Sequence, residues 1–239
     1  MTHLSLEKIL HSQGFGSRKQ CRIMVFNGRV AIDGVRCDDP QRVVETEHLQ
    51  FEVDGQRWQY RQHVYLALNK PAGVECSHQP QHHPSVYRLL PPQLVERGVQ
   101  CVGRLDQDTT GLLLLSDDGA FIHSYSAPKK KVPKVYQVTT KHPIQPELIT
   151  ALLAGVQLHD EPAPIAAAGC VQISAHVLHL TIAEGKYHQV KRMIAAAGNR
   201  VEALHRIAVG GYALAAALQP GEFSWLEPDD LAKIGQYAL

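Results

Sequence analysis

The residues best suited to chemistry in this 239-residue chain lie between positions 102 and 111. The run Val-Gly-Arg-Leu-Asp-Gln-Asp-Thr-Thr-Gly leads into an apolar stretch from Leu112 to Leu115. Arg104 and Asp106 are two residues apart, so an extended chain places both side chains on one face at the end of a strand. The Thr-Thr-Gly at 109–111 then predicts a turn. Without further support, the same run is also compatible with an edge strand and a polar hairpin turn.

Taken whole, the pattern GRLDxxTTGLLLL resembles the catalytic loop of pseudouridine synthases, in the branch that modifies ribosomal RNA and is typified by RsuA. The resemblance implies that Asp106 is the nucleophile and that Arg104 helps to displace the target base. Conversion of uridine to pseudouridine breaks the N1–C1′ bond, turns the uracil and joins C5 to C1′. Because nothing is oxidised or transferred, no cofactor is expected. Asp106 would act covalently or as a base at the sugar, and the sequence leaves both open.

Lys134-Val135-Tyr136 resembles the second motif of the same family, whose tyrosine stacks on the target uracil. A flipped base has lost its stacking neighbours, and an aromatic ring restores about 1 to 3 kcal/mol per base. Tyr136 could also assist loss of the proton from C5. The alternative is that Tyr136 is an ordinary strand residue that packs in the core.

The segment from Glu184 to Met193 resembles the third motif, which turns from a strand into a helix. The resemblance implies that Lys191 is the basic partner of Asp106, with Lys186 and Arg192 as alternatives. A cation a few ångströms from a carboxylate favours its ionised form, which a desolvated pocket would otherwise disfavour. A solvated amphipathic helix is the competing interpretation.

Charge is unevenly distributed, although the net charge is only +1. Five lysines and no acid lie between 127 and 142. Because phosphate contacts dominate affinity for nucleic acids, this run predicts an RNA-binding surface, although such runs are often only solvated faces. The RNA-binding residues predicted in this part of the chain are Lys129, Lys130, Lys131, Lys134, Lys186 and Arg192.

The N-terminal part predicts two short helices and a hairpin. The stripe Leu6, Ile9 and Leu10 predicts a helix that ends at Gly14. Ser17 can cap a second helix that ends before Gly28. Two alternating runs then flank the turn dipeptide Asp33-Gly34.

This N-terminal unit resembles the αL RNA-binding motif of a small-subunit ribosomal protein, which is fused to many RNA-modifying enzymes. The resemblance places Arg18, Lys19, Arg22 and Arg29 on a basic face that contacts phosphates without reading bases. The family usually begins with Arg-Leu-Asp-Lys, whereas residues 5–8 are Ser-Leu-Glu-Lys. One expected cation is therefore missing, which predicts weaker RNA binding. A helical hairpin with a charged surface is the alternative.

The expected architecture is α+β, with an αL RNA-binding domain at 1–60 and a pseudouridine synthase domain at 61–239. Residues 69–74 resemble the strand and turn that open the catalytic domain. Strands at 135–140 and 177–182 alternate with helices at 145–154 and 188–197, which predicts a mixed, mainly antiparallel sheet flanked by helices.

Residues 187–193, Tyr-His-Gln-Val-Lys-Arg-Met, resemble the branch that acts on 16S ribosomal RNA, whereas the large-subunit branch more often carries Asn-Arg-Gln-Ile-Arg-Arg-Met. The partner expected is therefore 16S RNA or a small-subunit assembly intermediate. The alternatives are a 23S enzyme and a non-catalytic RNA-binding assembly factor.

Composition agrees with a monomeric cytoplasmic enzyme: 44% of residues are hydrophobic, and no run approaches the roughly 18 apolar residues of a membrane span. His78, His82 and His83 invite a metal hypothesis. Prolines at 71, 80 and 84 instead predict an irregular loop there, so no metal site is expected.

Overall fold

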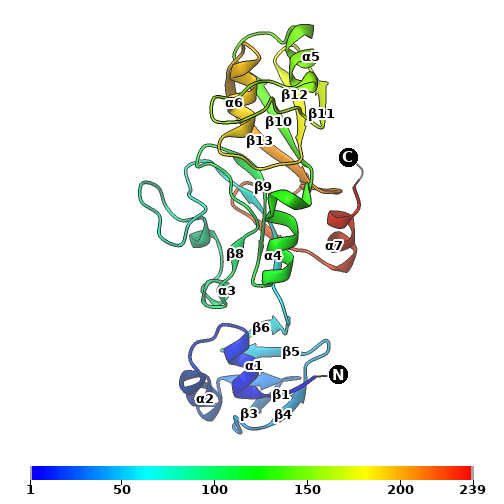
Figure 1. Ribbon diagram of the computed structural model, residues 1–239. Helices are drawn as coiled ribbons and strands as arrows, with labels where there is room; N and C mark the ends of the chain where they lie inside the picture. The colour runs from blue at the N-terminus through cyan, green and yellow to red at the C-terminus, as the bar shows by residue number, and fades with distance from the viewer. Residues whose placement is uncertain (1, 238–239) are drawn as a thin grey trace. The chain divides into compact units, whose positions relative to one another are not determined.

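The computed structural model describes residues 2–237, which divide into two compact units (Figure 1). The first unit comprises the chain up to Val64 together with Leu90–Val99, and the second comprises Tyr65–Leu89 and the chain from Gln100 onward. The sequence analysis assigned 90–99 to the second domain. This segment groups with the first unit because the Arg97 guanidinium donates to Gln13 Oε1 at 2.9 Å and to the Arg61 carbonyl at 3.0 Å.

The predicted helices and hairpins of the first unit are confirmed. Its elements are β1 (His3–Ser5), α1 (Leu6–Ser12), α2 (Arg18–Phe26), β2 (Val30–Ile32), β3 (Val35–Cys37), β4 (Val43–Glu45), β5 (Gln50–Val53), β6 (Gln56–Gln59) and α3 (Pro92–Glu96). The Ser17 hydroxyl accepts from the Gln20 backbone, while the Gln20 side chain accepts from the Ser17 backbone, so a capping box starts α2. Asp33 and Gly34 have φ values of 51° and 75°, as a tight hairpin turn requires.

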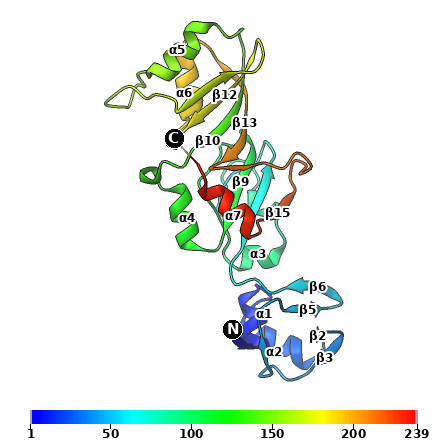
Figure 2. The ribbon, with the colours of Figure 1, turned by 90° about the vertical axis from the view of Figure 1, so that its right-hand side faces the viewer.

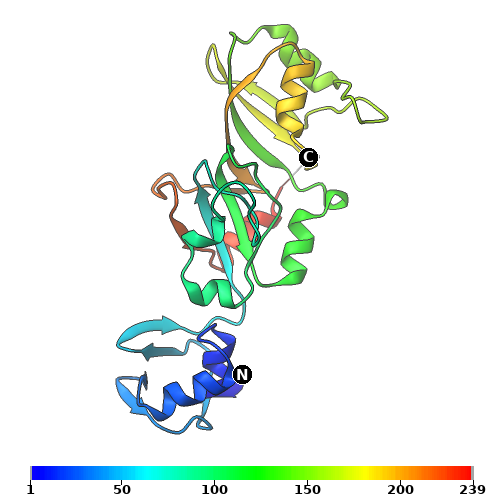
Figure 3. The ribbon, with the colours of Figure 1, turned by 90° about the vertical axis from the view of Figure 1, so that its left-hand side faces the viewer.

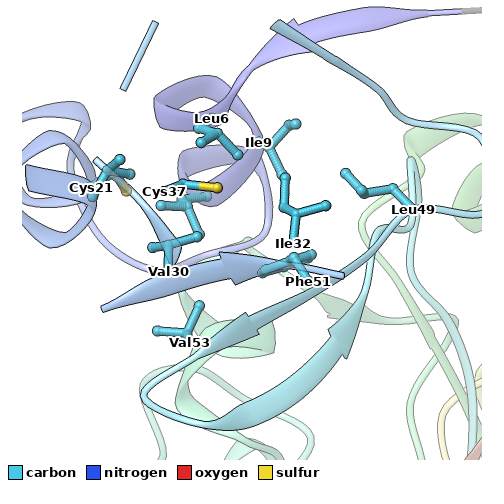
Figure 4. Close-up of a cluster of buried hydrophobic side chains, with 11 residues drawn as sticks. Leu6, Ile9, Cys21, Val30, Ile32, Cys37, Leu49, Phe51 and Val53 are labelled. Atoms are coloured by element: carbon cyan, nitrogen blue, oxygen red, sulfur yellow. The ribbon is translucent and has the colours of Figure 1, made fainter. Parts of the chain in front are cut away.

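Apolar side chains from both helices and from the sheet β3-β2-β5-β6 form the core of the first unit (Figure 4). Leu6, Ile9 and Cys21 point from the helices toward Val30 and Phe51 of the sheet. The helical stripe predicted from the sequence is therefore buried, and it leaves the polar faces of α1 and α2 to solvent.

The second unit is a mixed, mainly antiparallel sheet with helices at both ends, so the predicted α+β class is confirmed. Its strands are β7 (Tyr65–Lys70), β8 (Gln100–Cys101), β9 (Thr110–Ser116), β10 (Lys134–Thr140), β11 (Gly169–Gln172), β12 (Val177–Ile182), β13 (Val201–Val209), β14 (Tyr212–Ala213) and β15 (Phe223–Trp225). Its helices are α4 (Gly119–Ser126), α5 (Pro146–Ala154), α6 (Gln189–Ala196) and α7 (Pro228–Gly235), with 3₁₀ turns at Val86–Leu89 and Pro128–Lys130.

The main strand order is β11-β12-β10-β13-β9-β7-β15. Helices α5 and α6 lie at the β12 end of this sheet, whereas α4 and α7 lie at the other end (Figures 1 and 2). Strands β10 and β13 run side by side over most of their length (Figure 3). Among residues 2–237, no helix is long and apolar enough to cross a membrane.

Two antiparallel halves of the sheet meet where β13 pairs with β9 in parallel, with His205 opposite Thr110 and Arg206 opposite Gly111. One cross-strand row runs through this junction. Tyr136 is opposite Arg206, Arg206 is opposite Gly111, and Gly111 is opposite Lys70. Directly opposed residues share a face of a sheet, so this row places the side chains of Tyr136, Arg206 and Lys70 on one face, with Gly111 between the last two.

Gly111 is required at this junction. A Cβ at this position would lie 2.3 Å from the Arg206 carbonyl oxygen, and its φ is +98°. We expect Gly111→Ala to lower the free energy of unfolding by about 1–2 kcal/mol for the left-handed backbone and by about 1–3 kcal/mol more for the clash. Urea unfolding measures the loss.

Gly221→Ala is the matched control, because Gly221 has φ +89° and no heavy atom of the described residues within 4 Å of its Cβ position. Gly221→Ala should therefore lose only the free energy of unfolding that comes from the left-handed backbone, without the loss from a clash. Equal losses in the two variants would mean that the β9–β13 contact accommodates a methyl group.

Candidate active site

Residues 102–109 form a loop, which corrects the expectation that Arg104 and Asp106 share a face at the end of a strand. The chain turns between Asp106 and Thr109, where the Thr109 amide donates to the Asp106 carbonyl at 3.1 Å, and β9 begins only at Thr110. The turn predicted at 109–111 therefore lies at 106–109 instead, and residues 110 and 111 already belong to β9. The alternating polar residues before Thr109 predicted a strand. Backbone pairing with β7 and β13 starts only at Thr110 and Gly111, just before the apolar run.

Lys70 holds this loop in place. Its side chain is fully buried, and its ammonium donates to the carbonyl oxygens of Pro71 at 3.0 Å, Gln107 at 3.2 Å and Thr109 at 2.9 Å. Burial lowers the pKa of Lys70, although the nearby carboxylates of Asp106 and Asp108 oppose that shift. The sequence analysis did not assign Lys70 a role. The available signal was a lysine at the end of an otherwise apolar strand, directly before a proline.

The Asp106 carboxylate lies between two basic side chains from the third motif. Lys191 Nζ is 3.2 Å from one carboxylate oxygen, and His188 Nε2 is 3.4 Å from the other. The structure thus brings Lys191 to Asp106. His188 was not singled out from the sequence. It stands just before α6 with a left-handed backbone (φ 48°), a conformation uncommon outside glycine and found at sites where the backbone is constrained.

Lys191 is shared with a second carboxylate. Its ammonium donates to both oxygens of Asp108, at 2.7 and 2.9 Å. Partial burial alone would raise the pKa of Asp108, but the hydrogen bond and charge of Lys191 outweigh it and lower that pKa. Burial likewise opposes the charge of Lys191, yet its bonds to the two carboxylates raise its pKa. Asp108 and Lys191 therefore form a charged pair near neutral pH.

A pocket of about 80 Å³ adjoins Asp106. Its inner wall is apolar and nearly buried, formed by Leu105, Tyr136, Ile182 and Leu204. Its mouth is charged and more exposed, because the side chains of Asp106 and His188 are 32% and 36% accessible. This pocket can accept a flat, mostly apolar group with a polar rim and can present a carboxylate to it.

Tyr136 and Arg104 both line this pocket but differ in solvent exposure. Tyr136 lines it from β10 and is only 7% exposed, with the Arg206 guanidinium 6.0 Å from its ring centre. Arg104 also lines the pocket but is exposed, on the loop that precedes Asp106. Arg104 therefore shares the site with Asp106 through the loop, not through a common strand face.

Several residues predicted to bind RNA are engaged within the protein. Lys186 pairs with Glu161, and Arg192 lies 3.5 Å from Asp160. In the first unit Arg22 pairs with Glu7 at 2.8 Å, and Arg29 donates to both oxygens of Asp54. These acids hold the four cations in place and reduce the charge that each presents to solvent.

The remaining predicted RNA-binding residues differ in exposure. Arg18 and Lys19 are exposed at the start of α2, and Lys129, Lys130 and Lys131 are exposed on and after a 3₁₀ turn. Lys134 is half-buried and donates to the Val132 carbonyl at 2.9 Å. Burial, with a smaller contribution from Arg206, lowers the pKa of Lys134 to about 8.

The histidine-containing loop is organised by a carboxylate. Glu75 accepts backbone hydrogen bonds from Gln81, His82 and His83 at 2.8–3.1 Å. His78 stacks on Tyr87 with ring centres 3.6 Å apart. In the part of the chain that the structure describes, no group of three or more His, Cys, Asp or Glu side chains could hold a metal ion.

Comparison with known proteins agrees with this site. Residues 64–196 match the family model described as RNA pseudouridylate synthase, and residues 5–49 match the S4 domain. The chain therefore belongs to the RNA pseudouridylate synthase family, with an S4 domain at its N-terminal end. It is a pseudouridine synthase, as the sequence motifs predicted.

Individual relatives match over nearly their whole length. An uncharacterized RNA pseudouridine synthase of Bacillus subtilis, YtzG, is 39% identical over 95% of this chain and 97% of its own. The ribosomal small subunit pseudouridine synthase A of Escherichia coli is 36% identical over 97% of this chain and 100% of its own. A solved pseudouridylate synthase structure, 32% identical, has a TM-score of 0.68 and covers 97% of this chain and 99% of its own.

We expect Lys70→Met to lower kcat/KM for pseudouridine formation by about 10- to 100-fold, because a loop displaced by about 1 Å misplaces its reacting group. RNA affinity should change little. Steady-state rates and filter binding with the same RNA separate the two quantities. Lys141→Met, at an exposed lysine, is the control. An unchanged rate in Lys70→Met would mean that the loop keeps its geometry without the ammonium.

The half-buried Lys134 gives a pH-dependent prediction. Its pKa is about 8 in the folded protein and 10.5 ordinarily, so between these pH values the unfolded chain binds more protons and folding stability rises with pH. We expect Lys134→Met to be more stable than the wild type at pH 7, with the difference fading as pH approaches 10. Urea unfolding at several pH values measures this. A difference independent of pH, as expected for exposed Lys129→Met, would contradict it.

Proposed function

We propose that this enzyme converts a uridine of 16S ribosomal RNA to pseudouridine, with Asp106 as the nucleophile. The observation that carries the proposal is the Asp106 carboxylate between Lys191 and His188 at the mouth of a pocket lined by Tyr136. The curated relatives named ribosomal small subunit pseudouridine synthase A, which align over nearly the whole chain, support the choice of RNA.

In this proposal the target uridine leaves its stack and enters the pocket with its sugar toward Asp106. Asp106 attacks C1′, or removes a proton from the sugar, as the N1–C1′ bond breaks and its electron pair passes to the uracil. The uracil turns and C5 bonds to C1′ as the Asp106–C1′ bond breaks, or as the sugar proton is returned. C5 then loses its proton and N1 takes one up. The atoms of the product are those of the substrate, so no co-reactant is consumed. The residues do not favour one of the two routes.

The other site residues then have complementary tasks. Lys191 orients the Asp106 carboxylate and brings a positive charge beside it, with His188 on its other oxygen. Tyr136 stacks on the uracil and so offsets part of the unstacking free energy, while Arg104 helps to displace the target base from the RNA. All of these side chains line the pocket. They come from the loop, from β10, and from α6 and the residue before it.

RNA affinity in this proposal comes from exposed cations of both units. Arg18 and Lys19 on α2, with Lys129, Lys130 and Lys131, are the exposed candidates for phosphate contacts. Arg22, Arg29, Lys134, Lys186 and Arg192 contribute less, because each is paired with an acid or partly buried.

The proposal also carries the domain limits 1–60 and 61–239, a monomeric enzyme, and a location in the cytoplasm, where bacterial ribosomes are assembled. An assembly intermediate of the small subunit is an alternative form of the same substrate. The 23S enzyme is the second candidate, because Lys191 and Tyr136 serve the same chemistry on either RNA.

We expect Asp106→Asn to abolish pseudouridine formation while Asp108→Asn retains it. Both side chains bind Lys191, but only Asp106 lines the pocket. The measurement is pseudouridine mapping on 16S and 23S RNA, each refolded with and without ribosomal proteins. A new site in 16S RNA that is absent with Asp106→Asn supports the proposal.

Modification of 23S RNA alone would overturn the assignment of substrate. Full activity of Asp106→Asn would overturn the assignment of the nucleophile. Binding of RNA without modification under any of these conditions would favour the assembly-factor alternative.

A further inference from the structure

Thr109 has an unexplained polar atom at the pocket. The side chain lines the pocket and the residue is 1% exposed, yet its hydroxyl has no hydrogen-bond partner within residues 2–237. A buried hydroxyl without a partner costs about 1–3 kcal/mol. Most buried polar side chains are hydrogen-bonded, so an exception next to a nucleophile requires an explanation.

The backbone on both sides of this hydroxyl is fixed. The Thr109 amide donates to the Asp106 carbonyl at 3.1 Å, and the Thr109 carbonyl accepts from the buried Lys70 ammonium at 2.9 Å. Thr109 is therefore held beside Asp106 by the contacts that fix the loop, and its hydroxyl is buried in the pocket wall. Because its backbone is fixed, this donor loses little further conformational freedom when a ligand binds.

The neighbouring threonine provides a contrast. The Thr110 hydroxyl lies 2.8 Å from His205 Nδ1, so it is satisfied within the protein. Of the two adjacent threonines, only Thr109 both lines the pocket and keeps its hydroxyl free. Internal packing alone therefore does not account for a hydroxyl at position 109.

The pocket wall indicates which part of a ligand lies there. The buried side chains that line the pocket with Thr109 are mainly apolar, among them Leu105, Tyr136 and Leu204, whereas Asp106, Lys191 and His188 are more exposed. A sugar placed near Asp106 directs the attached base inward. A flat base buries its faces against apolar side chains, and its carbonyl oxygens then need a donor from the wall.

We propose that the Thr109 hydroxyl donates a hydrogen bond to a carbonyl oxygen of the target uracil. This inference rests on the proposed function, because it assumes that a uridine is the group that enters the pocket. Thr109 is then a binding residue for the base, and it favours pyrimidines that carry a carbonyl oxygen where the hydroxyl points.

Thr109→Val tests this, because valine keeps the shape and removes the hydroxyl. The loss of one neutral hydrogen bond to the substrate lowers kcat/KM by about 3- to 10-fold. Thr109→Ser keeps the hydroxyl and should retain most of the activity. Thr109→Val should also resist urea at least as well as the wild type, since it removes an unpaired buried group. Thr110→Val, which removes a paired hydroxyl, should be less stable.

A second arm uses RNA with 2-thiouridine or 4-thiouridine at the modified position. Sulfur is a weaker acceptor than oxygen, so the thio substitution at the contacted carbonyl should slow the wild type but not slow Thr109→Val further. Additive effects of the variant at both thio positions would overturn the proposal, as would unchanged kcat/KM in Thr109→Val.

Stability provides a test that does not depend on catalysis. If Thr109→Val is as destabilised as Thr110→Val, its hydroxyl has a partner inside the protein and the inference fails even if the enzyme is active. If the wild type modifies no uridine in any RNA, the proposed function fails instead, and the stability measurement still reports on the hydroxyl.

Discussion

The buried ammonium of Lys70 is the interaction on which the active site depends. The buried carbonyl oxygens of an irregular loop need donors from the protein, because water does not reach them. Lys70 donates to the carbonyls of Gln107 and Thr109, in the turn that follows Asp106, and to that of Pro71. Desolvation lowers the pKa of this lysine, so a charged group remains there at a cost that the carbonyls and the nearby carboxylates offset.

Sheet topology explains why this ammonium can reach the loop. Lys70, Gly111, Arg206 and Tyr136 follow one another across β7, β9, β13 and β10, and the row crosses the parallel junction of the two halves. Arg206 is buried in the same row and donates to the Leu112 carbonyl at 2.7 Å. Glycine at the crossing allows the backbones of β9 and β13 to approach, so the tyrosine and both buried cations lie along one row that ends beside the loop.

Local signals in the sequence predicted much of this architecture. The hydrophobic stripe of the first helix, Ser17 as a cap and the Asp33-Gly34 turn were sufficient for the first unit, because each depends on contacts within a few residues. The third motif also led to Lys191. Sequence alone did not reveal His188, because its approach to Asp106 depends on a left-handed residue before α6. Pairings such as Lys186 with Glu161 join distant segments, and no local pattern encodes them.

Sharing Lys191 between two carboxylates has a consequence for reactivity. The ammonium lies closer to Asp108, at 2.7 and 2.9 Å, than to Asp106, at 3.2 Å. A nucleophilic carboxylate must be ionised, yet a cation that binds its lone pairs tightly also lowers its tendency to attack. With Asp108 taking the shorter bonds, Lys191 still contributes its charge to Asp106, because Coulomb interaction falls slowly with distance. The lone pairs of Asp106 are therefore less strongly bound by Lys191 than those of Asp108. The second carboxylate of the loop therefore allows Lys191 to stand beside the proposed nucleophile without fully occupying its lone pairs.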